Sequence, residues 1–285
     1  MADRTFDTLV TGGSFFEGPR WRNGRWWVSD FYRHTVFAVD PDGTTEEVLT
    51  VEGQPSGLGW LPDGSLVVVS MRDRRVLRRA PDGTVDTYAD IAEHCGGLAN
   101  DLVVDAAGNT FVGNFGFDLM AGGTPRAANL VRIAPDGTVG VVADDLRFPN
   151  GAVITPDGST LIVGETMGGR YTAFTLGEHG TLSDRREWAA VEGVAPDGCS
   201  LDAEGCIWAA DALGNRLVRV AEGRGVIEEI PAPDGLGVYA CMLGGPAGTT
   251  LLACVAPDYF EHNRASAREA ELRTVEVEVP HAGLP

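Results

Sequence analysis

The chain has 285 residues, with 41 acidic and 22 basic side chains and a formal net charge of −19. This charge disfavours binding to nucleic acid or to an anionic membrane, because no basic stripe offsets it. The chain has no Lys, which excludes Schiff-base chemistry and covalent attachment of pyridoxal phosphate.

The N-terminal segment is not typical of a targeting signal. MADRTFDTLVTGG has neither a basic region nor an apolar core, and no apolar run approaches the ~20 residues of a membrane span. We therefore expect a cytoplasmic protein. The number of Cys is odd and their spacing has no CxxC pattern, so we expect buried, reduced thiols.

Short predicted strands recur along the chain and are separated by turns such as Asn-Gly and Pro-Asp-Gly. The first unit begins near residue 17, and further units begin near residues 56, 100, 150, 197 and 240. A repeat of roughly 40 to 50 residues built from short strands indicates a β-propeller with four-stranded blades. We therefore predict an all-β, six-bladed β-propeller around a central metal site, with residues 1–285 forming one domain. The N-terminal strand, in RTFDTLVTG, should close the ring as the outer strand of the last blade.

Pro-Asp-Gly occurs seven times. For six copies we expect a structural role, in which Pro fixes φ, Asp bonds to the local backbone and Gly adopts a positive φ. The remaining copy, at residues 196–198, precedes an inner strand and so stands apart from the others.

Five units place an oxygen-bearing side chain directly before the predicted inner strand, whereas the sixth has Ala240 there. These side chains belong to Glu17, Ser56, Asn100, Asn150 and Asp197. Equivalent positions on the inner strands should point toward one axis. Carboxylate and carboxamide oxygens that converge without Lys or Arg are typical of a site for a hard cation.

Each of these residues alone could be a turn or cap residue, but Glu is a poor turn former. Ser56 is the weakest member, because its short hydroxyl could simply bond to backbone, and Asp101 is interpreted as a structural acid beside Asn100. Two carboxylates and two amides would form a neutral site with one divalent metal ion. We expect Ca²⁺, with Mg²⁺, Mn²⁺, Zn²⁺ and Fe²⁺ as alternatives.

Other catalytic motifs are absent from the sequence. It contains no GxSxG, HExxH, Walker A or strand-associated GxGxxG pattern, and none of the five His occupies an equivalent position of the repeat. His94, just before Asn100, could overhang the site or lie in a solvated loop.

The sequence resembles the regucalcin–gluconolactonase family, which also includes senescence marker protein and luciferin-regenerating enzyme. The motifs that support this are EGP at 17–19, ND at 100–101, FPNG at 148–151 and PDG at 196–198. The resemblance implies a divalent-metal-dependent hydrolase that opens a lactone or cleaves a related ester, with metal-activated water as the nucleophile.

The resemblance also implies roles for single residues. Glu17, Asn150 and Asp197 would be metal ligands, and Asn100 would bind the metal or contact the substrate and the activated water. Asp197 would be the general base, although a carboxylate bound to metal is a weak base and Asp197 could be a ligand only. Sugar-lactone members have an Arg where this chain has Leu98. The resemblance therefore supports a polar sugar lactone as the substrate less strongly than it supports the reaction.

Loops that join the second and third strands should lie on the same face as the metal. We expect the substrate pocket to be lined by Leu98, Phe31, Tyr32, Met71, Phe115, Phe117, Met167, Tyr259 and Phe260. The alternative is that these side chains pack against each other as a loop core. If they line a pocket, alkyl or aryl lactones should be preferred over gluconolactone.

Two other functions are compatible with the pattern. One is a non-enzymatic propeller that binds Ca²⁺, and the other is an organophosphate-cleaving or nonhydrolytic enzyme on the same scaffold, because a fold alone does not define a reaction. The expected partner is a small-molecule lactone or ester, not nucleic acid or a membrane. The pattern makes no prediction of oligomeric state.

Overall fold

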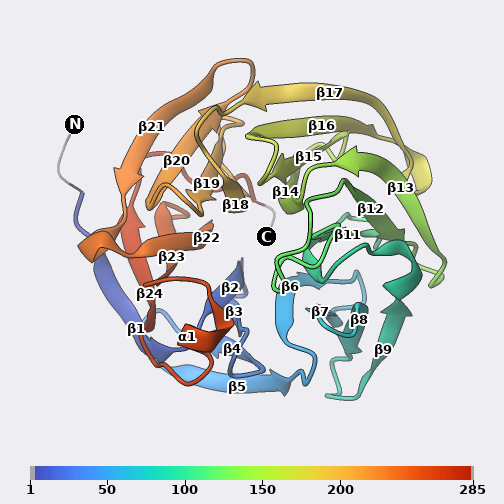
Figure 1. The fold of residues 1–285 in the computed structure, drawn as a ribbon. Coiled ribbons are helices and arrows are strands. Elements are labelled where there is room, and N and C mark those ends of the chain that lie inside the picture. The colour runs from blue at the N-terminus through green and yellow to red at the C-terminus, as the bar shows by residue number, and fades with distance from the viewer. Residues whose placement is uncertain (1–3, 284–285) are drawn as a thin grey trace.

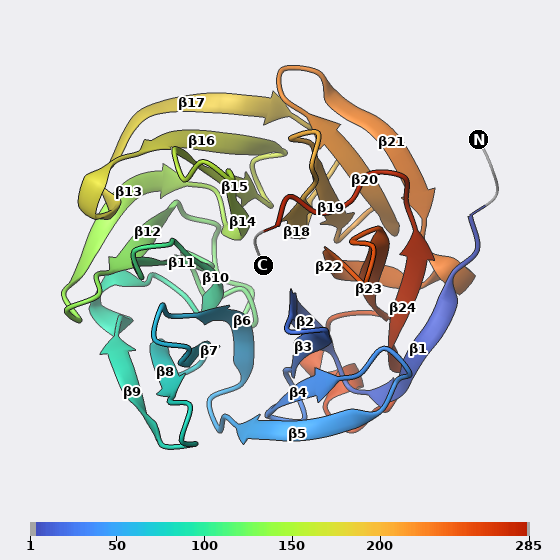
Figure 2. The same cartoon turned by 180° about the vertical axis from the view of Figure 1, so that it is seen from behind.

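Six four-stranded antiparallel sheets form a closed ring around a central axis (Figures 1 and 2). The structure, a computed structural model, describes residues 4–283. In five blades the strands follow one another from the axis outward in chain order, because each is joined to the next by a hairpin. The predicted all-β, six-bladed propeller is therefore confirmed.

The first three blades occupy the first half of the chain. Their strands are β2 (Phe16–Arg22), β3 (Arg25–Asp30), β4 (Thr35–Val39), β5 (Thr45–Thr50), β6 (Pro55–Trp60), β7 (Leu66–Ser70), β8 (Arg75–Arg79), β9 (Val85–Asp90), β10 (Ala99–Val104), β11 (Thr110–Asn114), β12 (Ala128–Ile133) and β13 (Val139–Leu146).

The last three blades use the second half of the chain and the N-terminal strand. Their strands are β14 (Pro149–Ile154), β15 (Thr160–Glu165), β16 (Arg170–Leu176), β17 (Leu182–Ala190), β18 (Pro196–Leu201), β19 (Ile207–Asp211), β20 (Arg216–Ala221), β21 (Gly225–Pro231), β22 (Gly237–Gly244), β23 (Thr250–Ala256), β24 (Ala270–Glu276) and β1 (Asp7–Gly13). Short 3₁₀ turns are found at Ala92–His94, Glu178–Gly180 and Pro233–Gly235, and the helix α1 at Glu261–Arg264.

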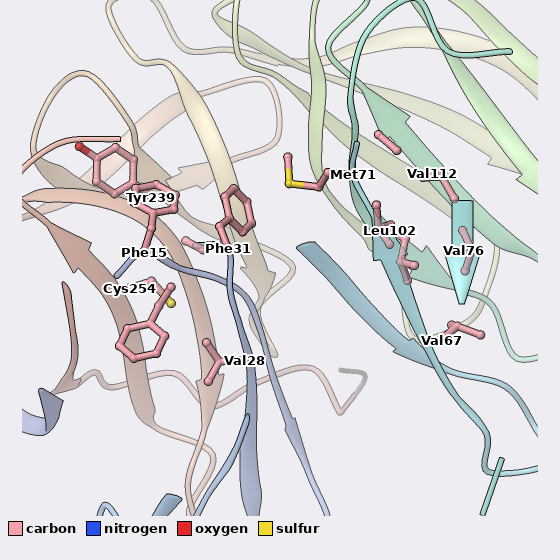
Figure 3. Packing of buried hydrophobic residues seen from close by; sticks show 14 of the residues in the cluster. Phe15, Val28, Phe31, Val67, Met71, Val76, Leu102, Val112, Tyr239 and Cys254 are labelled. Atoms are coloured by element: carbon pink, nitrogen blue, oxygen red, sulfur yellow. The ribbon is translucent and has the colours of Figure 1, made fainter. Parts of the chain in front are cut away.

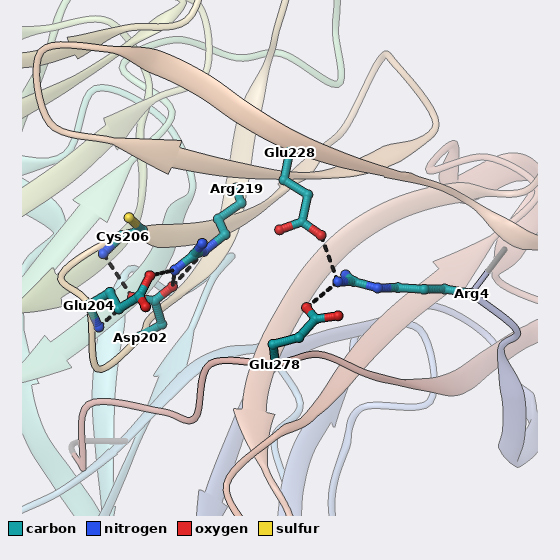
Figure 4. Close-up of polar contacts among 7 residues, drawn as sticks. All are labelled: Arg4, Asp202, Glu204, Cys206, Arg219, Glu228 and Glu278. Atoms are coloured by element: carbon teal, nitrogen blue, oxygen red, sulfur yellow. Dashed lines mark hydrogen bonds and ion pairs between the residues drawn. The ribbon is translucent and has the colours of Figure 1, made fainter. Parts of the chain in front are cut away.

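Both ends of the described chain help to close the ring. β1 pairs with β24 as the outer strand of blade six, as the blue and red strands of Figure 1 show. Arg4 then forms an ion pair with Glu228 of β21 at 2.7 Å and a second one with Glu278 (Figure 4). Near the C-terminus, the Ala203 N–H donates to the Pro280 carbonyl at 2.8 Å. Segments from both ends are thus attached to blade five.

Asp202 organises the first hairpin of blade five (Figure 4). Its carboxylate accepts the N–H groups of Glu204 and Cys206, both at 2.9 Å, and pairs with Arg219 at 2.7 Å. One buried carboxylate therefore fixes a turn and a neighbouring strand, and it lies outside the functional site described below.

Buried apolar side chains fill the space between adjacent blades. One cluster joins Val36 of blade one to Leu58 and Val68 of blade two, and another joins Phe111 of blade three to Phe174 of blade four. This packing of neighbouring sheets face to face gives the ring its core. All five Cys are free thiols, and four of them are buried, which agrees with the expectation of reduced Cys.

The Pro-Asp-Gly turns have the structural role that the sequence predicts. In five of the six copies, the Asp carboxylate accepts the N–H two residues ahead, at 2.8 to 3.1 Å. The Gly of all six copies has a positive φ, between 72° and 89°. No helix among residues 4–283 is long and apolar enough to span a membrane.

Candidate metal centre and substrate pocket

Each inner strand contains a β-bulge close to its first residue. In β18, pairing with β19 passes directly from Pro196 to Cys199, so Asp197 lies inside the bulge. Equivalent shifts occur at Asn100 in β10 and at Asn150 in β14, and the bulge of β2 begins after its Glu. A bulge turns side chains away from the regular strand alternation. The bulges therefore orient these side chains toward the axis.

The four predicted ligands lie at one cavity. Glu17, Asn100, Asn150 and Asp197 all line a space of about 400 Å³, and each is 6 to 8% exposed. They come from the inner strands of blades one, three, four and five. The repeat therefore predicts a group of residues that are up to 180 positions apart along the chain and that the fold places at one cavity.

In the sixth blade, the site position lies one residue earlier than the sequence repeat predicts. The bulge of β22 lies between Val238 and Ala240, so Tyr239 is equivalent to Asp197. Tyr239 also lines the cavity, whereas Ala240 does not. Assigning Ala240 to this position was wrong by one residue, because hydrophobic alternation alone does not reveal where a bulge shifts the register.

Glycine follows the site residue where neighbouring inner strands approach closely. A Cβ on Gly151 would lie 2.4 Å from the carbonyl oxygen of Asp197. A Cβ on Gly18 would lie 2.7 Å from the Ser56 carbonyl oxygen, and Gly18 also has a φ of +55°. These contacts explain why Gly follows Glu17 and Asn150, whereas Asn100 is followed by Asp101.

Buried carboxylates at the ends of the second strands hold the segments that precede the site. Asp30, Glu165 and Asp211 are fully buried, and they accept backbone N–H groups two or three residues before a site residue at 2.7 to 3.1 Å. Sequence reasoning missed these anchors. A signal was present, since an acid recurs at the end of the second strand in blades one, four and five.

The amide group of Asn150 has a defined orientation. The hydroxyl of Thr166 donates to the Pro196 carbonyl oxygen at 2.6 Å, and a carbonyl can only accept. The same hydroxyl oxygen therefore accepts from the Asn150 amide nitrogen, at 3.1 Å. Thr166 thus leaves the oxygen of Asn150 available to a metal ion, and no sequence pattern indicates this role of Thr166.

Ser56 supports the site without lining it. Its hydroxyl is buried and donates to the amide oxygen of Asn100 at 3.4 Å, and Ser56 is not among the residues that line the cavity. This placement agrees with the interpretation of Ser56 as the weakest candidate ligand.

A buried ion pair lies beside the carboxylates. Arg20 and Asp101 are 2.8 Å apart, and their side chains are 6% and 7% exposed. Arg20 also donates to the carbonyl oxygens of Pro19 and Leu102, at 2.9 and 2.7 Å. Asp101 therefore neutralises Arg20, whose charge acts on Glu17. Glu17, Asp101, Asp197 and Arg20 together have a formal charge of −2 when all three acids are ionised.

The two site carboxylates are destabilised as anions. Burial raises the pKa of Asp197 to about 8, and the charge of Asp101 adds to the increase. Burial and then the charge of Asp197 raise the pKa of Glu17 well above its ordinary value, although the Gly18 N–H opposes this. A cation between these groups would relieve both costs. The local charge of −2 and the oxygen donors therefore fit a divalent ion.

The donor set also indicates which ions fit. Among residues 4–283, no three His, Cys, Asp or Glu gather as a metal-binding cluster. The centre instead combines two carboxylates with two amides, which are the oxygen donors that Ca²⁺ and Mg²⁺ favour over thiolate or imidazole ligands.

Seven of the nine expected pocket residues line the cavity. They are Leu98, Phe31, Tyr32, Met71, Phe115, Met167 and Tyr259. Phe117 is buried behind the wall, edge-on to Phe148 with ring centroids 6.4 Å apart. Phe260 is 45% exposed and packs against Tyr259 outside the cavity. Neither of these two residues lines the pocket.

Several lining residues escaped sequence reasoning. Phe15, Gln54 and Phe148 each precede the site position of their blade by two residues, which is also the place of Leu98 in blade three. The repeat that identified the ligands could therefore have identified this ring of positions. Figure 3 shows Phe15 grouped with Phe31 and Tyr239, at centroid distances of 5.2 and 4.8 Å. The other unexpected lining residues are Leu119, Met120, Thr166, Ala212, Leu213 and Tyr239.

Known proteins with related sequences include lactonases. A pentonolactonase of Haloferax volcanii is 29% identical over 75% of this chain and 72% of its own length. A 6-deoxy-6-sulfogluconolactonase of Pseudomonas putida is 32% identical, but the match covers only 38% of this chain and 40% of that protein. Regucalcin of Xenopus laevis is 26% identical over 87% of this chain and 85% of its own length.

Solved structures share the fold along the whole chain. A luciferin-regenerating enzyme aligns with a TM-score of 0.83 at 18% identity, covering 98% of this chain and 97% of that one. A calcium-binding regucalcin of Agrobacterium tumefaciens aligns with a TM-score of 0.81 at 19% identity, covering 100% and 96%. At these identities the likeness establishes the fold only.

Residues 15–256 match the family described as the SMP-30/Gluconolactonase/LRE-like region. This range includes every inner strand and all four candidate ligands. The chain therefore belongs to the SMP-30/gluconolactonase/LRE-like family.

Proposed function

We propose that this protein is a divalent-metal-dependent hydrolase that opens a lactone ring or cleaves a related ester. The observation that carries the proposal is the convergence of two buried carboxylates and two amides on one cavity, with a local formal charge of −2 when the acids are ionised. Relatives named as lactonases support the reaction class.

Glu17, Asn150 and Asp197 are the proposed metal ligands. Thr166 supports this assignment because it keeps the Asn150 oxygen free. When bound, a divalent ion would polarise the ester carbonyl and make water more acidic.

Asn100 is proposed to contact the substrate. Its amide oxygen accepts from Ser56, which leaves its N–H groups free to donate to the oxygen that gains negative charge as the ester opens. Asn100 as a further oxygen ligand is the alternative arrangement. Water is the proposed nucleophile, and we assign Asp197 as the acceptor of its proton, with a role as a metal ligand only as the alternative.

Hydrolysis of a lactone panel by chelator-treated protein tests this proposal. Activity should be lost with the chelator and return on addition of Ca²⁺, Mg²⁺, Mn²⁺ or Zn²⁺. Glu17→Gln and Asp197→Asn should abolish it, whereas Ser56→Ala should have a mild effect. Parallel assays with phosphotriesters test the organophosphate alternative, which would be favoured if only these substrates were cleaved.

A calcium-binding protein without activity is the second candidate function. It is compatible with the oxygen donors of the centre, and a regucalcin that shares the fold is described as calcium-binding. The cavity above the candidate ligands argues for an enzyme, because an ion bound only for stability does not need about 400 Å³ of adjacent space. Tight Ca²⁺ binding with no turnover of any lactone, ester or phosphotriester would favour the calcium-binding protein.

A further inference from the structure

The walls of the cavity differ chemically from its polar centre. On the side of blades one and six, Phe15 packs with Phe31 and Tyr239 (Figure 3). We call these three residues the first aromatic wall. On the side of blades three and four, Phe115 stacks on Phe148 with ring centroids 4.4 Å apart and planes 21° apart. This pair is the second aromatic wall.

The backbone at Phe148 is held in an unfavourable conformation. Its φ is +62°, in the left-handed region, although it is aromatic and precedes Pro149. Such conformations are costly and persist where the surrounding structure fixes them, often at ligand sites. Here the conformation accompanies a side chain that stacks on Phe115 and lines the cavity.

The walls offer few groups that could replace the hydration of a sugar. Among residues 4–283, no Arg or His lines the cavity, so no cationic side chain is available to pair with a carboxylate or sulfonate on the substrate. The Tyr32 hydroxyl donates to the Tyr259 carbonyl at 2.9 Å, and Thr166 is engaged with Asn150. The other wall side chains that could form hydrogen bonds are the amide of Gln54 and the hydroxyls of Tyr239 and Tyr259.

These features lead to a substrate class. Polar hydroxyl groups buried without hydrogen-bond partners reduce affinity, whereas apolar groups buried against aromatic rings increase it. We propose that the substrate is an uncharged lactone or ester with an alkyl or aromatic substituent, bound between the two aromatic walls. Phe15, Leu98 and Phe148 are the residues that select this substituent. The inference rests on the hydrolase proposed above.

A comparison of matched lactones tests the selection during turnover. With the metal bound, kcat/KM should rise roughly fourfold for each methylene added to δ-valerolactone, and by about two orders of magnitude for δ-nonalactone, which has a butyl group. Gluconolactone should be a poorer substrate than δ-nonalactone. A preference for gluconolactone would overturn the inference and leave the proposed hydrolase intact.

Variants locate the selection in the walls. Phe148→Ala and Phe15→Ala should each remove at least tenfold of the preference for δ-nonalactone over δ-valerolactone. Phe260→Ala is the matched control, because this aromatic residue lies outside the cavity and should leave the ratio unchanged. Equal ratios in all three variants and the parent protein would contradict the assignment.

Binding of lactams separates this inference from the proposed reaction. Lactams resist hydrolysis, so calorimetry with the metal-loaded protein reports recognition even if no lactone is turned over. A 6-butyl-2-piperidone should bind at least tenfold more tightly than gluconolactam. Tighter binding of gluconolactam would overturn the inference, whereas tight binding of the butyl lactam without lactone turnover would contradict only the hydrolase.

Discussion

Thr166→Val should weaken metal binding without changing a single proposed ligand. Thr166 donates to the Pro196 carbonyl and accepts from the Asn150 amide, and Val preserves the shape of the side chain but removes both hydrogen bonds. The Asn150 amide could then rotate and turn its N–H groups toward the ion. Removing a group that orients a metal ligand typically costs 10- to 100-fold in affinity, or about 1.4 to 2.8 kcal/mol.

Calorimetric titration of chelator-treated protein with Ca²⁺ measures this effect. Thr166→Ser is the matched control, because it retains the hydroxyl and should bind Ca²⁺ within about threefold of the parent protein, well below the loss typical of a missing orienting group. Thermal unfolding of the metal-free variants separates loss of affinity from loss of folding. Unchanged affinity in Thr166→Val, or equal losses in both variants, would refute the argument that this hydroxyl orients the Asn150 amide.

Three further predictions concern the surroundings of the centre. Arg20→Met should lower the free energy of unfolding by about 3 to 5 kcal/mol, because it leaves Asp101 as an unpaired buried charge. Adding Asp101→Leu should recover much of the lost stability, as measured by denaturant unfolding. A loss below about 1 kcal/mol in Arg20→Met would contradict this prediction. The pKa of Asp197, raised to about 8 in the folded protein, means that the folded state holds a proton that the unfolded state releases above about pH 4. The melting temperature of the metal-free protein should therefore fall as pH rises from 5 to 8, and an Asp197→Asn variant that shows the same fall would argue against this cause. Gly151→Ala should lower Ca²⁺ affinity and stability together, since its Cβ would lie 2.4 Å from the Asp197 carbonyl oxygen. Calorimetry and denaturant unfolding of the purified variant measure the two effects. If neither changes, the inner strands can move apart to accept the Cβ, and the prediction is wrong.

The sequence predicted the ring and the polar centre because both repeat with the blades. Strand alternation and Pro-Asp-Gly turns are local signals, and equivalent positions on inner strands must face one axis. Glu17, Asn100, Asn150 and Asp197 could therefore be proposed as a group. Their convergence on one cavity follows from the symmetry of the fold.

What the sequence did not predict depends on contacts between blades and on local backbone conformation. The ion pair between Arg20 and Asp101 joins blades one and three, and no local pattern specifies it. The left-handed backbone of Phe148 contradicts the extended conformation that a residue before Pro ordinarily adopts. Local backbone preferences therefore do not predict that the Phe148 ring lines the cavity. Phe117 and Phe260 are aromatic loop residues like those that line the pocket. The folded conformation of the loops determines which aromatic side chains face the cavity, and these two do not.

A titration that follows bound metal and lactone hydrolysis in the same samples tests the central claim most directly. Chelator-treated protein should have no activity, and hydrolysis should rise in proportion to occupancy until one divalent ion is bound per chain. Glu17→Gln and Asp197→Asn should show neither the ion nor the activity. Hydrolysis that is unchanged without metal, or full metal occupancy in both carboxylate variants, would contradict the account.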